Sequence, residues 1–266
     1  MVSATFQCQE SQARTERCAI MNTTPTSHKL ISAAILCSTV LSACTTPVSS
    51  EPIKKIPVAW STGFTMPELL ETPIVHLEAH RDLEKLLTAP WYSGITVSQT
   101  TVEETTFSSC NDYFNNAKPS TRTIKDDEMD AYLELTMMCE ATKILINARE
   151  AKVSYLPYHT LNKEAPRLWP KEVALQISTE EARRAASNQN LITWNDVTPI
   201  TRYEKKSETK STYFHQGGSQ EVEIVGTGDT NNDDVEDLII TVRDHTDEGS
   251  YFNIRLFVLS KDRQGS

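Results

Sequence analysis

The sequence is poor in glycine, in positive charge and in long apolar runs, and each shortage excludes a class of protein. Glycine accounts for 8 of the 266 residues, and no glycine-rich loop of the kind that binds phosphate is present. Lysine and arginine together number 26 against 36 aspartates and glutamates, which gives a formal net charge of −10. Because nucleic acids and anionic lipid head groups attract cationic proteins, this charge disfavours both as partners. Only one apolar run is present, so a bundle of membrane-spanning helices is excluded.

The familiar catalytic motifs are also missing. The sequence contains no C-x-x-C, no G-x-S-x-G and no H-E-x-x-H. The segment from His76 to His80 carries its glutamate two positions after the first histidine, about 200° around a helix from it, where it cannot serve as a zincin base. A stripe of His76, His80 and Glu84 leaves a zinc site open, although a solvated helix flank is the preferred interpretation. His215 to Ser219 is expected to form a hairpin turn.

The single apolar run, Leu30 to Leu41, ends in Leu41-Ser42-Ala43-Cys44. Twelve residues are too few to cross about 30 Å of hydrocarbon, so the run is typical of a signal peptide and not of a membrane span. The four-residue ending resembles the lipobox of bacterial lipoprotein precursors. That resemblance implies cleavage before Cys44 and lipidation of this cysteine with a diacylglycerol group and an acyl chain such as palmitate. Ordinary cleavage after Ala43, without lipidation, is the alternative.

The leader also predicts how the chain is organised. A start at Met21 gives a suitable polar lead-in, so residues 1–20 are interpreted as an over-extended N-terminus and residues 21–43 as the lipoprotein signal. Residues 44–58 are rich in Thr, Ser and Pro and are expected to form a flexible tether, followed by one domain over 59–266. A subdivision near 153–172 is the alternative. Because Thr45 and not aspartate follows the cysteine, the resemblance implies an outer-membrane anchor with a periplasm-facing body in a Gram-negative bacterium.

The cysteines agree with export to an oxidising compartment. Beyond the leader and Cys44 only Cys110 and Cys139 remain, an even number that predicts one disulfide. Closing this loop is expected to stabilise the fold by about 3–4 kcal/mol. A redox-active or zinc-binding pair is the alternative, which neither a C-x-x-C spacing nor a nearby histidine supports.

Periodicity predicts an α+β fold, with a helical N-terminal part, one long central helix, and a C-terminal antiparallel β-meander on which that helix packs. A first helix is expected from Val75 to Leu87, with Pro90 ending it, and one or two short strands over 93–107. A polar loop is expected after Cys110, through Asn115, Asn116 and Pro119. Ser178 and Glu181 form a capping box for a short helix to about Asn188. The long helix is predicted over 124–152, and the meander strands over 197–204, 210–215, 221–226, 238–243 and 251–260.

One acidic loop has the spacing of a cation site. Side-chain oxygens at Asp229, Asn231, Asp233 and Asp237, with the carbonyl of Val235, occupy alternate positions before an apolar strand. Ca²⁺ requires six to eight oxygens, which such a loop can supply. The spacing resembles the D-x-[DN]-x-D-G-x-x-D loops of FG-GAP repeats, and that resemblance implies a structural Ca²⁺ site. Where the family has glycine this chain has Asp234, and an acidic turn without an ion is the alternative.

These observations predict where the chain acts more firmly than what it does. The leading hypothesis is a non-enzymatic interaction or structural module of the envelope, with a protein or peptidoglycan partner and an anchor at Cys44. An envelope hydrolase with a dispersed active site is the second hypothesis, and a small-ligand or metal-binding receptor is the third. A hydrolase requires two or more histidines to converge with acidic residues in one cleft, whereas a receptor requires a deep apolar pocket.

Overall fold

The computed structural model describes residues 54–99, 104–157, 159–175, 177–248 and 251–261, and the backbone of strands β1 (Thr5–Ser11) and β2 (Thr15–Met21). The expected lipobox, residues 41–44, lies outside these ranges. No helix within them combines the length and the apolar character that crossing a bilayer requires.

The fold is α+β, as predicted, and its C-terminal half is a five-stranded antiparallel meander. The strands are β7 (Ile200–Lys205), β8 (Lys210–His215), β9 (Gly218–Gly228), β10 (Asp237–Thr246) and β11 (Phe252–Leu259). Each pairs with the next along the chain. Short strand β3 (Ala59–Trp60) pairs with the end of β9, and β2 pairs in parallel with the second half of β11.

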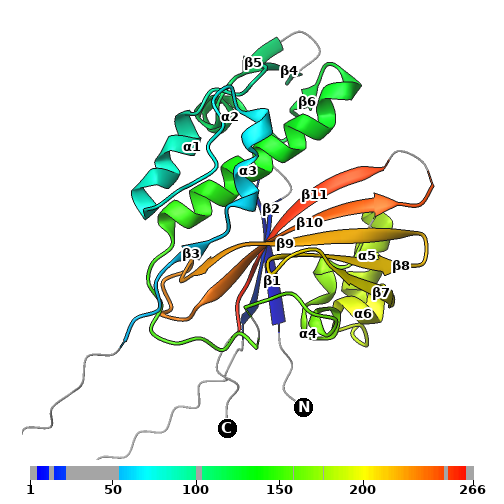
Figure 1. Cartoon of the computed structure of the whole chain (residues 1–266). Coiled ribbons are helices and arrows are strands. Elements are labelled where there is room, and N and C mark those ends of the chain that lie inside the picture. The colour runs from blue at the N-terminus through cyan, green and yellow to red at the C-terminus, as the bar shows by residue number, and fades with distance from the viewer. Residues whose placement is uncertain are drawn as a thin grey trace, which may run out of the picture.

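The long helix α3 (Met129–Asn147) crosses one face of this sheet (Figure 1). It follows a 3₁₀ turn at Asp126–Glu128 whose acidic side chains are favourable at a helix N-terminus. Leu135, Met138 and Leu145 of the helix belong to one buried core with alternate β11 residues such as Ile254 and Leu256. The expected packing of the helix on the meander is therefore confirmed.

A second layer of short elements covers the other side of α3. These elements are α1 (Glu84–Thr88), β4 (Ile95–Ser98), β5 (Glu104–Phe107), α2 (Cys110–Asn116) and β6 (Arg122–Thr123). The three strands form a small sheet in the order β5-β4-β6. Cys110 and Cys139 form the predicted disulfide, with Cα atoms 5.3 Å apart, so that α2 is tied to the middle of α3.

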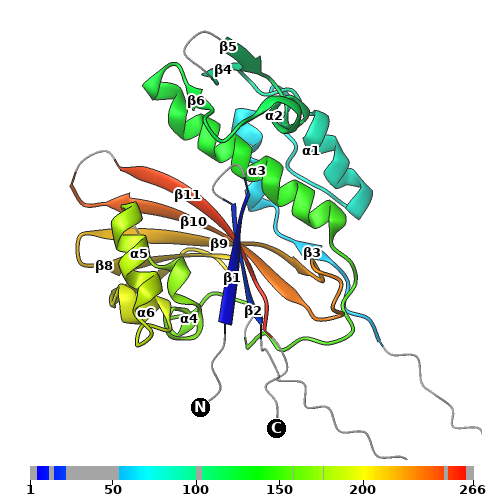
Figure 2. The same ribbon diagram turned by 180° about the vertical axis from the view of Figure 1, so that it is seen from behind.

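The opposite face of the main sheet carries a smaller helical layer (Figure 2). It consists of α4 (Ala165–Leu168), α5 (Thr179–Ser187) and α6 (Trp194–Val197). Trp194 and Tyr213 pack edge to face in a second core, with ring centroids 4.8 Å apart. The capping box of Ser178 and Glu181 is present as predicted.

Three expected elements differ from the structure. The long helix ends at Asn147 and not at 152, because residues 149–153 run extended and bridge to Asp229, Ile56 and Val235. Residues 73–79 are not helical, and Val75 is exposed, so the first helix begins only in the 3₁₀ turn His80–Leu83. The polar segment after Cys110 was expected to be a loop but forms α2, which Ser109 caps by accepting the Asp112 N–H.

Candidate binding groove

A cavity of about 390 Å³ lies between α3, the segment that joins α2 to β6, and the beginning of β11. The helix contributes Met129, Leu133 and Met137 to its wall, and β11 contributes Phe252 and Ile254. We call this cavity the α3–β11 groove. It is bounded by a helix on one side and by the first residues of a strand on the other, so it can accept an elongated ligand.

The polar groups in the groove wall are mostly engaged within the chain. Tyr113 donates a hydrogen bond of 3.0 Å to Oε1 of Glu140, and Thr136 donates to the carbonyl of Tyr132. Burial raises the pKa of Tyr132 to about 12 and raises that of Tyr113 further. Neither phenol ionises near neutral pH, so these two groups provide hydrogen bonds and apolar surface and no general base.

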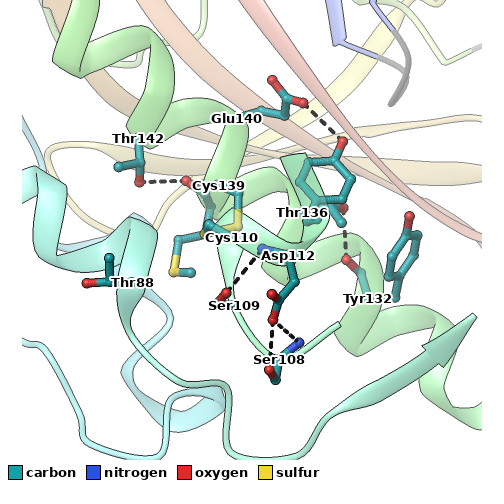
Figure 3. Close-up of a disulfide and its surroundings, with 12 residues drawn as sticks. Thr88, Ser108, Ser109, Cys110, Asp112, Tyr132, Thr136, Cys139, Glu140 and Thr142 are labelled. Carbon is teal, nitrogen blue, oxygen red and sulfur yellow. Dashed lines mark hydrogen bonds between the residues drawn. A yellow bond between two sulfur atoms is a disulfide. The ribbon is translucent and has the colours of Figure 1, made fainter. Parts of the chain in front are cut away.

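The Cys110–Cys139 disulfide ties together the two helices of this wall (Figure 3). Cys110 and Cys139 are both fully buried. Tyr113 lies one turn after Cys110 and Glu140 directly follows Cys139, so the bridge holds the two partners of one hydrogen bond. Since the S–S link fixes α2 against α3, the groove is formed before any ligand arrives, and less conformational entropy is lost on binding.

Positive charge lies at one mouth of the groove. Arg122 is exposed and donates a hydrogen bond of 2.7 Å to the carbonyl of Thr121. No carboxylate of the described residues forms an ion pair with it. Its guanidinium group therefore keeps donors available for an incoming acidic group.

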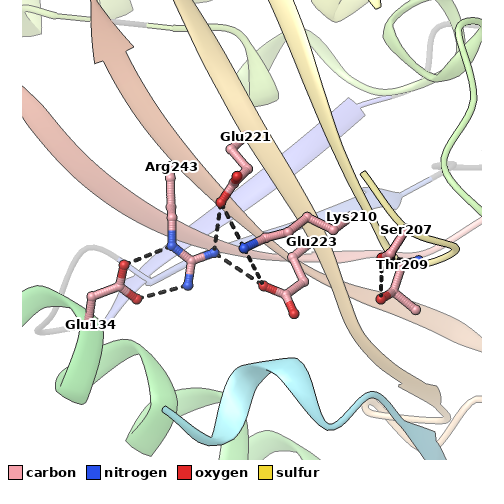
Figure 4. A network of polar contacts seen from close by, with 7 residues as sticks. All are labelled: Glu134, Ser207, Thr209, Lys210, Glu221, Glu223 and Arg243. Carbon is pink, nitrogen blue, oxygen red and sulfur yellow. Dashed lines mark hydrogen bonds and ion pairs between the residues drawn. The ribbon is translucent and has the colours of Figure 1, made fainter. Parts of the chain in front are cut away.

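A second, wider cavity of about 780 Å³ lies on the other side of the N-terminal half of α3. It is lined by an ion network in which Arg243 donates to both carboxylate oxygens of Glu134, each at 2.8 Å, and also contacts Glu223 (Figure 4). Lys210 pairs with Glu221 at 3.0 Å. These acids are neutralised by internal partners, so the network joins α3 to the sheet and does not offer open charge to a ligand.

The acidic loop is closed by its own carboxylates. Oδ1 of Asp229 accepts the backbone N–H groups of Asn231, Asn232 and Asp233, and Oδ2 accepts that of Asp234. Asn232 and Asp234 have positive φ angles, and Asp234 stands where the related loops have glycine. The turn is an aspartate-capped structure whose folding is explained by hydrogen bonds alone.

This loop fits an ion poorly. Asp237 is fully buried and accepts hydrogen bonds from Thr230 and Ser260, which turns its carboxylate toward these partners. Burial raises its pKa, and the hydrogen bonds oppose that shift only in part. Across the described residues, no group of three or more His, Cys, Asp or Glu side chains is placed to hold a metal. Calcium binding by Asp229, Asn231, Asp233, Val235 and Asp237 stays a prediction.

The histidines of the described ranges do not converge. His80 Nε2 lies 2.8 Å from the carbonyl oxygen of Leu145, His159 pairs with the buried Glu236, and the ring of His245 lies tilted beside that of Phe252. His215 is buried beside the β8–β9 turn, which is the hairpin expected from the sequence. The expectation that His76, His80 and Glu84 lie on one helix face is wrong, because His76 precedes the helical turn that begins at His80.

The α3–β11 groove is not apparent in the amino-acid sequence. Its lining comes from α2, β6, α3 and β11, which are separated in the chain and meet only through packing. The one available signal was the spacing of Tyr132, Leu133, Thr136 and Met137, which makes a helix apolar on more than its core face.

Comparisons with known proteins give no relative from which a function could be transferred. No family model, no curated protein and no solved structure matches the chain.

Proposed function

We propose that this chain is a lipid-anchored envelope protein whose body acts by binding another polypeptide in the α3–β11 groove. The observation that carries the proposal is the groove itself, an apolar cavity between a helix and a strand with its wall fixed by a disulfide. Its phenols stay protonated and its acids are engaged, which favours recognition over catalysis. The scattered histidines argue against the hydrolase hypothesis.

The anchor is proposed from the lipobox at Leu41–Cys44. Two acyl-type attachments at Cys44 would hold the body stably at a bilayer, whereas one chain gives only marginal binding. Nine residues separate Cys44 from Lys54, the first described residue of the domain. Fully extended, that tether spans about 35 Å, so the groove would act on partners close to the membrane.

The anchor is tested by metabolic labelling with radioactive palmitate. The wild-type chain is expected to incorporate label, to begin at residue 44 and to sediment with membranes. Cys44→Ser is expected to lose the label and the membrane association while its melting temperature stays that of the wild type. A mature form that begins at another residue contradicts the anchor.

Binding is tested in intact cells with a photoreactive amino acid at Leu133, which is half-buried in the groove wall. The expected result is one discrete protein adduct that a photoreactive group at Leu168, half-exposed on the opposite layer, does not give. Absence of an adduct specific to Leu133 contradicts polypeptide binding in this groove.

A further inference from the structure

The two edges of the main meander are protected to very different degrees. At one edge, β7 carries the exposed charged residues Arg202 and Lys205 and the half-buried Glu204, and its register against β8 is broken near Ile200. Charges and a bulge are the usual means by which a sheet edge avoids pairing with another chain. The β7 edge is therefore closed to strand addition.

Strand β11 has none of these protections. Its eight residues contain no proline and no lysine, and its register against β10 is regular from end to end. Arg255, the one charged residue in the strand, is buried and bonded to Asp244 on the second face of the sheet. Since almost all β11 side chains are buried in the two cores, the strand offers mainly backbone N–H and C=O groups along its outer edge.

An added strand is already present on this edge. β2 pairs with residues Leu256–Leu259 in parallel. The first half of β11, Phe252–Arg255, pairs with no strand on its outer side within the described chain, and residues 252–254 line the groove. Cleavage before Cys44, if it occurs as proposed, removes β1 and β2 and leaves the whole edge open.

We infer that the α3–β11 groove binds its partner by strand addition, with an extended segment of another protein hydrogen-bonded to the backbone of Phe252–Arg255. This inference rests on the proposed function and specifies how the groove works. Main-chain hydrogen bonds provide affinity in such complexes, and pockets for alternate side chains provide specificity. Here one side chain of the segment fits against Leu133, Met137 and Ile254.

The charge at the groove mouth defines the segment further. Arg122 has no carboxylate partner in the described chain, so an acidic residue of the segment would complete a charge-assisted hydrogen bond. A second copy of β11 does not meet this requirement, because Phe252–Leu259 contains no acidic residue. The occupant that we assign is therefore an apolar extended segment of a partner protein that carries a carboxylate, and an edge-to-edge dimer through β11 does not supply that carboxylate.

The test uses the mature anchored chain, purified from membranes in mild detergent both free and as the adduct captured through Leu133. Hydrogen–deuterium exchange is measured on the free chain and on the adduct. The amides within residues 252–255 that point away from β10 are expected to exchange at least about tenfold more slowly in the adduct, whereas those of β7 are unchanged. An adduct without that protection overturns strand addition and leaves the proposed function intact.

Two matched pairs of variants test the contacts. In the first pair the photoreactive group is placed at Met137. Leu133→Arg fills the groove and is expected to lower the yield of the adduct by about tenfold, whereas Leu168→Arg is expected to leave it unchanged. Arg122→Glu is expected to weaken capture, and Arg184→Glu, the same charge change on exposed α5, to leave it unchanged. Melting temperatures establish that each variant folds. An adduct of two copies of this chain, or equal effects within each pair, overturns the assignment of the occupant.

Discussion

Asp229 shows how one side chain can fold a loop. It is buried, and its two oxygens accept four successive backbone N–H groups, which bends residues 229–234 into a tight turn. The same residue would be the first ligand of the expected Ca²⁺ site. The structure therefore assigns Asp229 a role in stability that does not depend on an ion.

Asp229→Ala is expected to lower the free energy of unfolding by about 2–3 kcal/mol, because four successive backbone N–H groups lose a charged acceptor. Asp233→Ala, at an exposed position of the same loop, is expected to cost less than about 1 kcal/mol. Urea unfolding with calcium and with a chelator measures both. If calcium raises the stability of the wild type but not of the Asp229 variant, the loop is an ion site after all.

Glu172 is a residue whose charge is unfavourable in the fold. Its Oε2 atom is buried and has no hydrogen-bond partner among the described groups, and burial raises the pKa of the carboxyl above 4.5. The folded state then binds the proton more tightly than the unfolded state. Stability is therefore highest below the unfolded pKa and falls as pH rises through the folded pKa.

Glu172→Gln is expected to raise the melting temperature at pH 7, since the ionised carboxylate is removed, and to lose this advantage below about pH 4. Melting curves across this range measure the effect. The exposed Glu71→Gln is the control and should show no comparable gain at pH 7. A Glu172→Gln variant that is less stable than the wild type at pH 7 contradicts the claim that the charge of Glu172 destabilises the fold.

At the scale of elements, the disulfide connects α2, which belongs to the layer on the far side of α3, to α3 itself, which packs on the main sheet. α2 and α3 are short and long helices whose cysteines are 29 residues apart in sequence. Both sulfurs lie in the first core, with no exposure. The bridge restricts the unfolded chain and also holds the groove wall, so stability and binding are expected to change together.

Replacing both cysteines by alanine is expected to lower the free energy of unfolding by about 3–4 kcal/mol, the chain-entropy value for a loop of this size. Urea unfolding measures this loss. The groove should also loosen, so capture through Leu133 should fall even at temperatures where the variant is folded. If the destabilised variant is captured as well as the wild type, the disulfide does not maintain the binding groove.

At the scale of the whole molecule, two cores share one sheet. Ile254 and Leu256 face α3, whereas Phe257 and Leu259 face the layer of α4, α5 and α6. The side chain of Arg255 also reaches the face of α4, α5 and α6, where it donates hydrogen bonds to the carbonyls of Glu172 and Val173. Neither helical layer can keep its core if β11 is lost.

The chain from residue 54 onward is therefore expected to unfold in one cooperative step, without the separate subdomain expected as an alternative near 153–172. Tryptophan fluorescence reports on both cores, through Trp91 in the first and Trp194 in the second. Single-tryptophan variants that retain one of these residues should give the same urea midpoint. Two separate midpoints would show that the layers unfold independently.

Sequence patterns were sufficient for the parts of the fold governed by local chemistry. Apolar alternation located all five meander strands within a few residues, the capping box at Ser178 located α5, and cysteine parity gave the Cys110–Cys139 bridge. These features depend on neighbours in the chain or on a count, so the sequence contains them directly.

Tertiary structure decided the rest. Residues 149–153 leave the helix because their backbone bridges to Ile56 and to Asp229 and Val235 of the acidic loop, partners that no local pattern reveals. The groove exists because α2, β6, α3 and β11 meet in space, and the open edge of β11 is defined only by which strands stand beside it. The sequence determined which residues are buried in strands and helices, because burial follows local periodicity. Packing determined which backbone groups stay open to a partner, because an open edge depends on the arrangement of the whole sheet.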